Sequence, residues 1–251
     1  MNKIALITGG SRGLGKSTAL HLAKRHIGII VTYHSDKQAA QEVITEIEQL
    51  GGKAFALQCD IRDVAKFAEF SRQLKLILGE YFERQSFDYL VNNAGTGLHR
   101  MMDTTKVSDL DDMLNIHVKG PFFFTQTLLP LINNGGHIVN ISSGLARFTF
   151  PGSGAYAMAK GAVEVMTRYM AKEFANQGIR VNTLAPGAIA TDFRGGAIRD
   201  SQQAQAMVAS VTALGRVGEA DDIAKAISAL LNDGLDWVTG QRIEVSGGMM
   251  L

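Results

Sequence analysis

The sequence predicts an α/β fold in which a parallel sheet is covered by helices on both faces. Short apolar runs rich in β-branched residues recur along all 251 residues, and stretches of helical periodicity separate them. Parallel strands need a crossover connection, so this alternation indicates βαβ units. Because no linker, repeat or low-complexity tract interrupts it, we expect residues 1–251 to form one domain.

Seven apolar runs have the length and composition of buried parallel strands, beginning with IALIT and GIIVTY. We expect these strands at residues 4–8, 28–33, 53–59, 87–92, 137–142, 179–185 and 241–247. Helical periodicity predicts helices at about 13–24, 37–50, 63–84, 108–119, 121–132, 155–176 and 221–231. The second of these helices runs into Gly51-Gly52, a stop signal.

The segment from about 193 to 216 breaks the alternation. It contains Gly195-Gly196 and a helical stretch, QQAQAMVASV, but no strand. Long insertions after strands often close over substrates, so we expect a lid here, although plain surface packing is the alternative.

Composition excludes several classes of function. A net charge of +1 gives no electrostatic basis for binding nucleic acid, and 46% hydrophobic with 20% charged residues is typical of a globular protein. The single Cys59 allows neither an internal disulfide nor a multi-cysteine metal site, so we expect no metal. The longest apolar stretch is broken by Thr125-Gln126-Thr127, and the N-terminus lacks the pattern of a signal peptide. We therefore expect a cytoplasmic protein that does not associate with membranes.

A glycine-rich turn, TGGSRGLGKST, follows the first expected strand and opens a helix. Backbone N–H groups and a helix N-terminus in this position can bind a phosphate. Two motifs overlap there: Gly10-x-x-x-x-Gly15-Lys16-Ser17 matches the P-loop pattern, whereas strict G-x-G-x-x-G fails at Thr18. A P-loop NTPase also needs an acidic residue after an apolar strand, and no later strand ends that way convincingly. We interpret the P-loop match as a coincidence and Lys16 as a solvated residue.

Tyr156 and Lys160 are four residues apart on an expected helix, with Ser143 thirteen residues before the tyrosine. Residues i and i+4 share a helix face, so the phenol and the ammonium can point into one cleft. A nearby cation favours the phenolate and lowers the pKa of a tyrosine, which suits general acid–base catalysis. Alone, the pair could equally be a half-buried tyrosine beside a solvated lysine.

Taken together in order, the motifs resemble those of the short-chain dehydrogenase/reductase family. They are Thr8-Gly9-x-x-x-Gly13-x-Gly15, Asn92-Asn93-Ala94-Gly95, Asn115, Ser143, Tyr156-x-x-x-Lys160 and Pro186-Gly187. The resemblance implies a doubly wound Rossmann fold, usually with seven parallel strands. It implies that Tyr156 is the general acid or base, that Lys160 lowers its pKa and binds the nicotinamide ribose, and that Ser143 holds the substrate oxygen. Asn115 would help to hold a water molecule that supplies protons to Lys160. The side chain of Ser142 should point to the opposite side of its strand from that of Ser143.

The resemblance also implies a set of cofactor contacts. Asp60 would contact the adenine, although it could instead cap the following helix, a task for which Asp63 competes. Thr191 would reach the carboxamide of the nicotinamide. The full expected set is Gly9, Ser11, Arg12, Gly13, Leu14, Gly15, Tyr33, His34, Ser35, Asp60, Ile61, Asn93, Ala94, Gly95, Tyr156, Lys160, Pro186, Gly187, Ile189 and Thr191.

The end of the second strand predicts NADPH rather than NADH as the cofactor. An acidic residue there would bind the ribose 2′-OH of NAD and repel a 2′-phosphate, but this strand ends Thr32-Tyr33-His34-Ser35. Arg12 can donate a charge-assisted hydrogen bond to a phosphate. Sequences similar to this one with such an arginine generally use NADPH.

We therefore expect an NADPH-dependent reductase of a carbonyl compound, either a small ketone or a 3-oxoacyl thioester. Residues 94–102, 144–153 and 187–213 should line a mostly apolar pocket, in which His99, Arg100 and Arg147 could meet an anionic or carrier-linked substrate or be solvated. An inactive NADP-binding regulatory or scaffold protein is the alternative. The resemblance implies a homo-oligomer, either a tetramer or a dimer, and the stretch containing GEYFERQS looks longer than is typical.

Overall fold

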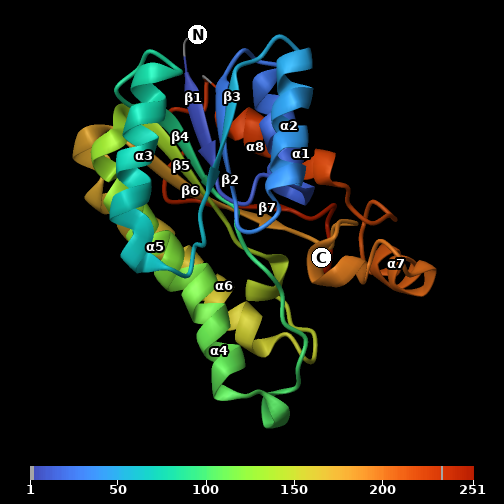
Figure 1. The fold of residues 1–251 in the computed structure, drawn as a ribbon. Helices are drawn as coiled ribbons and strands as arrows, with labels where there is room; N and C mark the ends of the chain where they lie inside the picture. Colours follow the sequence, from blue (N-terminus) through green and yellow to red (C-terminus); the bar gives the residue numbers. More distant parts are fainter. Residues whose placement is uncertain (1–2, 233) are drawn as a thin grey trace.

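Seven parallel strands form the central sheet of the computed structural model, which describes residues 3–232 and 234–251. The strands are β1 (Ile4–Ile7), β2 (Gly28–Tyr33), β3 (Ala54–Gln58), β4 (Phe87–Asn92), β5 (Ile132–Ile141), β6 (Arg180–Pro186) and β7 (Arg242–Val245). They lie in the order β3-β2-β1-β4-β5-β6-β7 (Figure 1). The winding direction reverses between β1 and β4, so the predicted doubly wound fold is confirmed.

Helices cover both faces of this sheet (Figure 1). One face carries α1 (Gly13–Ala23), α2 (Lys37–Gln49) and α8 (Ala220–Leu230), and the other carries α3 (Phe67–Glu80), α5 (Gly120–Leu128) and α6 (Gly154–Glu173). Successive strand residues point to opposite faces, so Ala5 and Ile7 pack with the first group of helices and Leu6 with the second. The sheet thus separates two apolar cores, which hold the strand ends at fixed positions.

Several boundaries differ from those expected. The helix expected at 63–84 is a 3₁₀ turn at Val64–Lys66 followed by α3, and β5 begins five residues before the expected strand. The helix expected at 108–119 is α4 (Val107–Leu114) followed by a π-helical turn, Asn115–Lys119. Proline has no N–H for the α-helical bond four residues back, and Pro121 is the second residue after this turn. The Gly120 N–H donates instead to the Asn115 carbonyl, the five-residue spacing of a π-helix.

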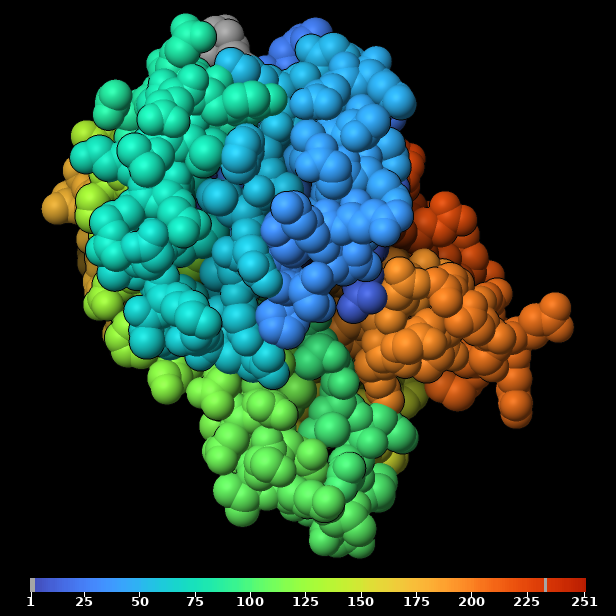
Figure 2. Space-filling model, in the orientation of Figure 1, coloured from blue at the N-terminus to red at the C-terminus, as the bar shows by residue number. Residues whose placement is uncertain are grey.

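Two segments extend from the carboxyl ends of the strands. The first contains α4 and is the green lobe in Figure 2, and the second contains α7 (Gln202–Ser210) and is the orange projection. The second segment contains the expected lid. No helix in the described part of the chain is long and apolar enough to cross a membrane.

Candidate active site

The glycine turn after β1 is shaped by contacts that exclude side chains. Gly9 has a φ of +65°, and a β-carbon on it would lie 2.9 Å from the Ala94 α-carbon. A β-carbon on Gly15 would lie 2.3 Å from the Gly9 carbonyl oxygen. Gly13 also has a positive φ, +54°, and opens α1, whose first turn contains no acidic residue. The free N–H groups of this first turn are therefore available to an anion.

Lys16 and Ser17, which completed the P-loop pattern, make contacts with other helices. The Lys16 ammonium pairs with Glu46 on α2 at 2.6 Å, so it is not the solvated residue we expected. Ser17 donates to Asp221 on α8, also at 2.6 Å. These two side chains stabilise helix packing, which agrees with our interpretation of the P-loop match as a coincidence.

The segment after β4 is hydrogen-bonded to the glycine turn. The Asn93 side-chain amide donates to the carbonyls of Thr8 and Gly9, at 2.9 and 3.0 Å. The Thr8 hydroxyl accepts from the backbone N–H groups of Asn93 and Ala94. Thr191 also lies against the turn, since a β-carbon on Gly13 would lie 3.7 Å from the Thr191 β-carbon. Three distant parts of the chain that were expected to bind cofactor therefore meet at one edge of the sheet.

The remaining expected contacts after β6 lie at the same edge. Pro186 ends β6, and a β-carbon on Gly187 would lie 2.8 Å from the Ser246 α-carbon. Ile189 forms an isolated parallel bridge with Gly218. These contacts bring the chain from β6 toward Thr191 and the glycine turn.

The end of β2 carries the residues expected to select the cofactor. Tyr33 is buried, whereas His34 and Ser35 are exposed, as is Arg12 in the glycine turn before α1. Asp60 lies beside them, 3.3 Å from the His34 ring. This edge thus presents exposed polar and cationic groups, together with the Asp60 carboxylate, which is paired with His34.

Asp60 does not cap the following helix. Its carboxylate accepts from the Arg62 backbone N–H and pairs with the Arg62 guanidinium at 2.8 Å. Hydrogen bonds from Arg62 lower the pKa of Asp60 to about 2. Ile61, the adjacent residue in the expected cofactor set, is buried. The Arg62 bonds hold the Asp60 carboxylate beside the end of β2.

Tyr156, Lys160 and Ser143 meet at the end of β5. Tyr156 and Lys160 lie on α6 and are 8% and 5% exposed. The Lys160 ammonium lies 5.6 Å from the centre of the Tyr156 ring and donates to the Ile141 carbonyl at 2.7 Å. Ser143 accepts from the Leu145 N–H and is hydrogen-bonded to Tyr156. The three side chains are therefore close enough to act on one substrate oxygen.

The pKa of Tyr156, which we expected Lys160 to lower, is raised in this structure. Burial raises the pKa of Tyr156 to about 12, opposed by the Ser143 hydrogen bond and by the charge of Arg194. Burial also lowers the pKa of Lys160 to about 7, so its ammonium is only partly charged near neutrality. Desolvation disfavours the charged forms of both side chains and is the largest cause of each shift. The pair therefore rests as a neutral phenol beside a readily deprotonated amine.

His117 and Asn115 lie in the same π-helical turn but in different surroundings. Asn115 is half-buried at the first position of the turn. His117 is 2% exposed, and its ring meets the Tyr156 ring edge-on, with 5.2 Å between centroids. A small cavity beside Lys160 is lined, among the described residues, by His117 and not by Asn115. The role expected for Asn115 remains a prediction.

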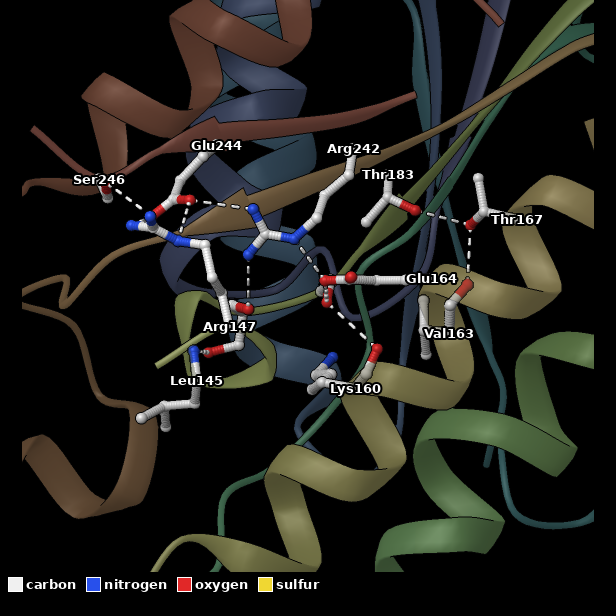
Figure 3. A network of polar contacts seen from close by, with 12 residues as sticks. Leu145, Arg147, Lys160, Val163, Glu164, Thr167, Thr183, Arg242, Glu244 and Ser246 are labelled. Atoms are coloured by element: carbon white, nitrogen blue, oxygen red, sulfur yellow. Dashed lines mark hydrogen bonds and ion pairs between the residues drawn. The ribbon is translucent and has the colours of Figure 1, made fainter. Parts of the chain in front are cut away.

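A polar network supports the strand end that carries Ser143 (Figure 3). Ser142 does not face Tyr156: it donates to the Glu164 carboxylate at 2.8 Å and to the Lys160 carbonyl. Arg242 on β7 pairs with Glu164 at 2.7 Å and reaches the Ser143 carbonyl at 3.3 Å. Arg242 also pairs with Glu244, which binds Arg147. The network joins β5, α6 and β7 behind the three expected catalytic side chains.

The approach to Tyr156 is lined by aromatic and apolar groups. Phe193 from the expected lid has its ring centroid 5.8 Å from that of Tyr156, and Phe148 and Phe150 pair edge-to-face at 6.0 Å. Phe193 and Arg194 pack against Gly97, where a β-carbon would lie within 2.7 Å of both. The segment after β4 and the lid thus touch beside the tyrosine.

The cations expected to meet an anionic substrate are mostly paired with carboxylates. Arg100 pairs with Asp109 at 3.1 Å, and Arg147 with Glu244 at 2.9 Å. The His99 ring fills the space beside Gly152. Arg194 is instead the cation whose charge acts on Tyr156.

Sequence reasoning missed His117, Arg194 and the pair formed by Glu164 and Arg242. His117 carried a weak signal, since it lies two residues after Asn115, but the π-helical turn that orients it was not predicted. Arg194 lies next to Gly195 in a segment without regular periodicity. Glu164 follows Lys160 by one helical turn, and only the fold brings it to Arg242.

Comparisons with known proteins agree over the whole chain. A family model described as enoyl-(acyl carrier protein) reductase matches residues 9–250. The 3-oxoacyl-[acyl-carrier-protein] reductase FabG of Staphylococcus epidermidis is 36% identical over 253 residues, covering 100% of both chains. The hydroxynaphthalene reductase-like protein Arp2 of Metarhizium guizhouense is 34% identical, over 98% of this chain and 94% of its own.

Solved structures give the same result. The promiscuous reductase LugOII, which catalyses keto-reduction at C1 during lugdunomycin biosynthesis, has a TM-score of 0.94 and 38% identity, covering 100% of this chain and 99% of its own. The angucycline C-6 ketoreductase LanV with bound NADP also has a TM-score of 0.94, with 31% identity, covering 100% and 96%. A short-chain dehydrogenase/reductase from Serratia marcescens has a TM-score of 0.91 and 29% identity, covering 100% and 99%.

Proposed function

The chain belongs to the short-chain dehydrogenase/reductase family and is an NADPH-dependent carbonyl reductase, and on this premise we propose that Tyr156 protonates a ketone held by Ser143. The observation that carries this assignment is the cluster of the half-buried Ser143 with the buried Tyr156 and Lys160 at the end of β5. All three groups are present and together, so nothing favours the alternative of an inactive regulatory protein.

The residues at the glycine turn fit a dinucleotide. The first turn of α1 offers free N–H groups with no acidic side chain nearby, which suits a diphosphate. Arg12 in the glycine turn and His34 after β2 are exposed and can meet a 2′-phosphate, and the Asp60 carboxylate is held by Arg62. The nicotinamide of the bound cofactor supplies the hydride.

Tyr156 donates the proton in this reaction, and Ser143 holds the oxygen that receives it. Because burial holds the pKa of Tyr156 at about 12, the phenol keeps its proton near neutral pH and can donate it to the developing alkoxide. The Ser143 hydroxyl can hold that same oxygen, where negative charge develops. A protonated Tyr156 suits reduction better than oxidation, so we propose that reduction is the favoured direction.

The substrate we propose is a ketone borne on a largely apolar, aromatic ring system. The ring centroid of Phe193, which is 41% exposed, lies 5.8 Å from that of Tyr156, so an aromatic side chain stands beside the reacting tyrosine. Arg100 and Arg147 are neutralised by carboxylates, which gives less support to a phosphate-bearing carrier. Among the similar proteins, LanV is an angucycline C-6 ketoreductase and Arp2 is a hydroxynaphthalene reductase-like protein.

The test is NADPH oxidation by the purified protein against matched ketones. The panel contains naphthalene-derived and tetralone-type ketones, simple aliphatic ketones and 3-oxoacyl thioesters. We expect kcat/KM to be highest for the ring-borne ketones. Preferred turnover of 3-oxoacyl thioesters would contradict the proposed substrate, and no turnover of any member would contradict the assigned chemistry.

We also propose a cytoplasmic homo-oligomer. Large apolar side chains are exposed along α5 and α6, including Phe122, Met158, Val165 and Tyr169. Exposed apolar patches of this kind support subunit contact. Light scattering should give the mass of a tetramer or a dimer, whereas a monomer at micromolar concentration would contradict the proposal.

A further inference from the structure

His117 has one ring nitrogen that is satisfied and one that is not. Its Nε2 lies 2.7 Å from the Thr96 carbonyl, which can only accept a hydrogen bond, so Nε2 carries the proton. Nδ1 is then a bare acceptor, and it is buried with no partner among the described residues. Burial and the charge of Lys160 hold the pKa of His117 well below its usual range, so the ring stays in this neutral form.

Asn92 presents a second buried acceptor. Its side-chain nitrogen donates to the Thr125 hydroxyl at 3.0 Å and to the Asn140 side-chain oxygen at 2.8 Å, which uses both of its N–H groups. Asn140 in turn donates to Thr167, so the direction of this hydrogen-bonded chain is fixed. The Asn92 Oδ1 is buried and has no partner in the described structure.

These acceptors and the Lys160 ammonium border one cavity. The cavity has about 10 Å³ of free volume, and its lining includes His117, Asn92 and Lys160. A space of that size holds a single water molecule when two to four polar groups are within reach. Lys160 uses one N–H on the Ile141 carbonyl, and a charged ammonium has two more to donate.

We propose that Lys160, His117 and Asn92 together bind one buried water molecule, which completes the acid–base site. The water accepts from the Lys160 ammonium and donates to His117 Nδ1 and Asn92 Oδ1, so all three groups gain a partner. His117, not Asn115, is the residue that positions this water. The inference rests on the proposed role of Lys160 beside Tyr156.

The consequence is a more stable ammonium on Lys160. A water whose two hydrogens are held by His117 and Asn92 must turn its lone pairs toward Lys160, which favours the charged form. The other charged or titratable groups near Lys160 are Tyr156 on α6, Arg194 in the lid, and the mutually paired Glu164 and Arg242 behind β5. None of these replaces the lost water if His117 is removed.

A structure of the complete protein at high resolution tests the site without any substrate. We expect electron density for one water within hydrogen-bonding distance of all three polar atoms. A dry cavity would overturn the proposal, whatever compound the enzyme reduces.

Kinetics of the variants His117→Phe and His117→Asn test the positioning role on any ketone that is turned over. The alkaline limb of the kcat profile should move to lower pH in His117→Phe by about one unit, so kcat falls about tenfold at pH 8 and little at pH 5.5. The affinity for NADPH and KM should change little. His117→Asn, which keeps an acceptor, should recover most of the lost kcat at pH 8.

His137→Phe is the matched control, because His137 is also fully buried and neutral with an unpartnered Nδ1. It lies in the middle of β5, bonded to Asn182 at 2.9 Å, and its variant should keep the parent pH profile. If kcat fell by the same factor at every pH in both His117→Phe and His137→Phe, His117 would have only a packing role, and the proposal would be overturned.

Discussion

The proposed acid–base cluster and the proposed lid beside it are built in opposite ways. Tyr156, Lys160 and His117 are each less than 9% exposed, whereas Phe193 is 41% exposed and Arg194 has a φ of +55° in a segment with two further left-handed glycines. In the cluster, burial raises the pKa of Tyr156 and lowers that of Lys160, so the neutral form of each is favoured. In the lid, Arg199 makes exposed ion pairs with Asp192 and Asp200, which contribute little stability. The comparison teaches that the side chains proposed to transfer protons are held in place by tight packing. The segment proposed to contact the substrate is exposed and can change its conformation.

The largest effect should come from Tyr156→Phe, which removes the proton and keeps the ring contacts. We expect kcat to fall on the order of 10³-fold, because general acid catalysis is lost. Binding of NADPH, measured by fluorescence titration, should be nearly unchanged. Tyr169→Phe, on the exposed side of the same helix, is the control and should keep normal turnover. Near-normal turnover in Tyr156→Phe would sink the assignment.

Lys160→Met should reduce turnover and at the same time stabilise the fold by a few kcal/mol at about pH 6. Burial lowers the pKa of Lys160 from 10.5 to about 7, so the unfolded chain binds the proton more tightly. The destabilisation by Lys160 is therefore complete below pH 7 and fades as the pH rises from about 7 toward 10.5.

Urea unfolding of Lys160→Met and of the parent protein at pH 6 and about pH 9.5 measures this difference. Lys172→Met, exposed near the end of the same helix, should show no such pH dependence. Equal stability of Lys160→Met and the parent at both pH values would mean that the lysine is solvated, and the contrast between cluster and lid would fail.

Arg12→Ala tests the exposed edge of the cofactor site. A hydrogen bond to a charged group contributes about 1.5–3 kcal/mol, so the Kd for NADPH should rise at least about tenfold. The Kd for NADH should change much less, because NADH has no 2′-phosphate. An equal loss of affinity for NADPH and NADH would show that Arg12 does not recognise the 2′-phosphate. Arg72→Ala, on the exposed face of α3, is a charge-matched control.

The fold and the positions of the motif residues were predictable because both depend on local pattern. Apolar runs of strand length fix β1, β2 and β4 nearly to the residue, and the spacing of Tyr156 and Lys160 follows from the helix. The π-helical turn was not predictable from periodicity, since it arises where Pro121 removes an N–H. The pKa of Tyr156 was predicted in the wrong sense because desolvation depends on packing that no local pattern encodes.

Arg194 gives the smallest effect and separates charge from backbone strain within the lid. Arg194→Gly and Arg194→Ala both remove the positive charge that counteracts the rise in the pKa of Tyr156 caused by burial. Tyr156 then becomes a weaker acid, so both variants should lower kcat by about the same few-fold factor. Their stabilities should differ, because a φ of +55° is unstrained only for glycine. We expect Arg194→Gly to be more stable than Arg194→Ala by about 1 kcal/mol in thermal unfolding. If the two variants unfold alike, the left-handed turn at Arg194 does not persist in solution, and the lid adjusts at this residue as well as at its glycines.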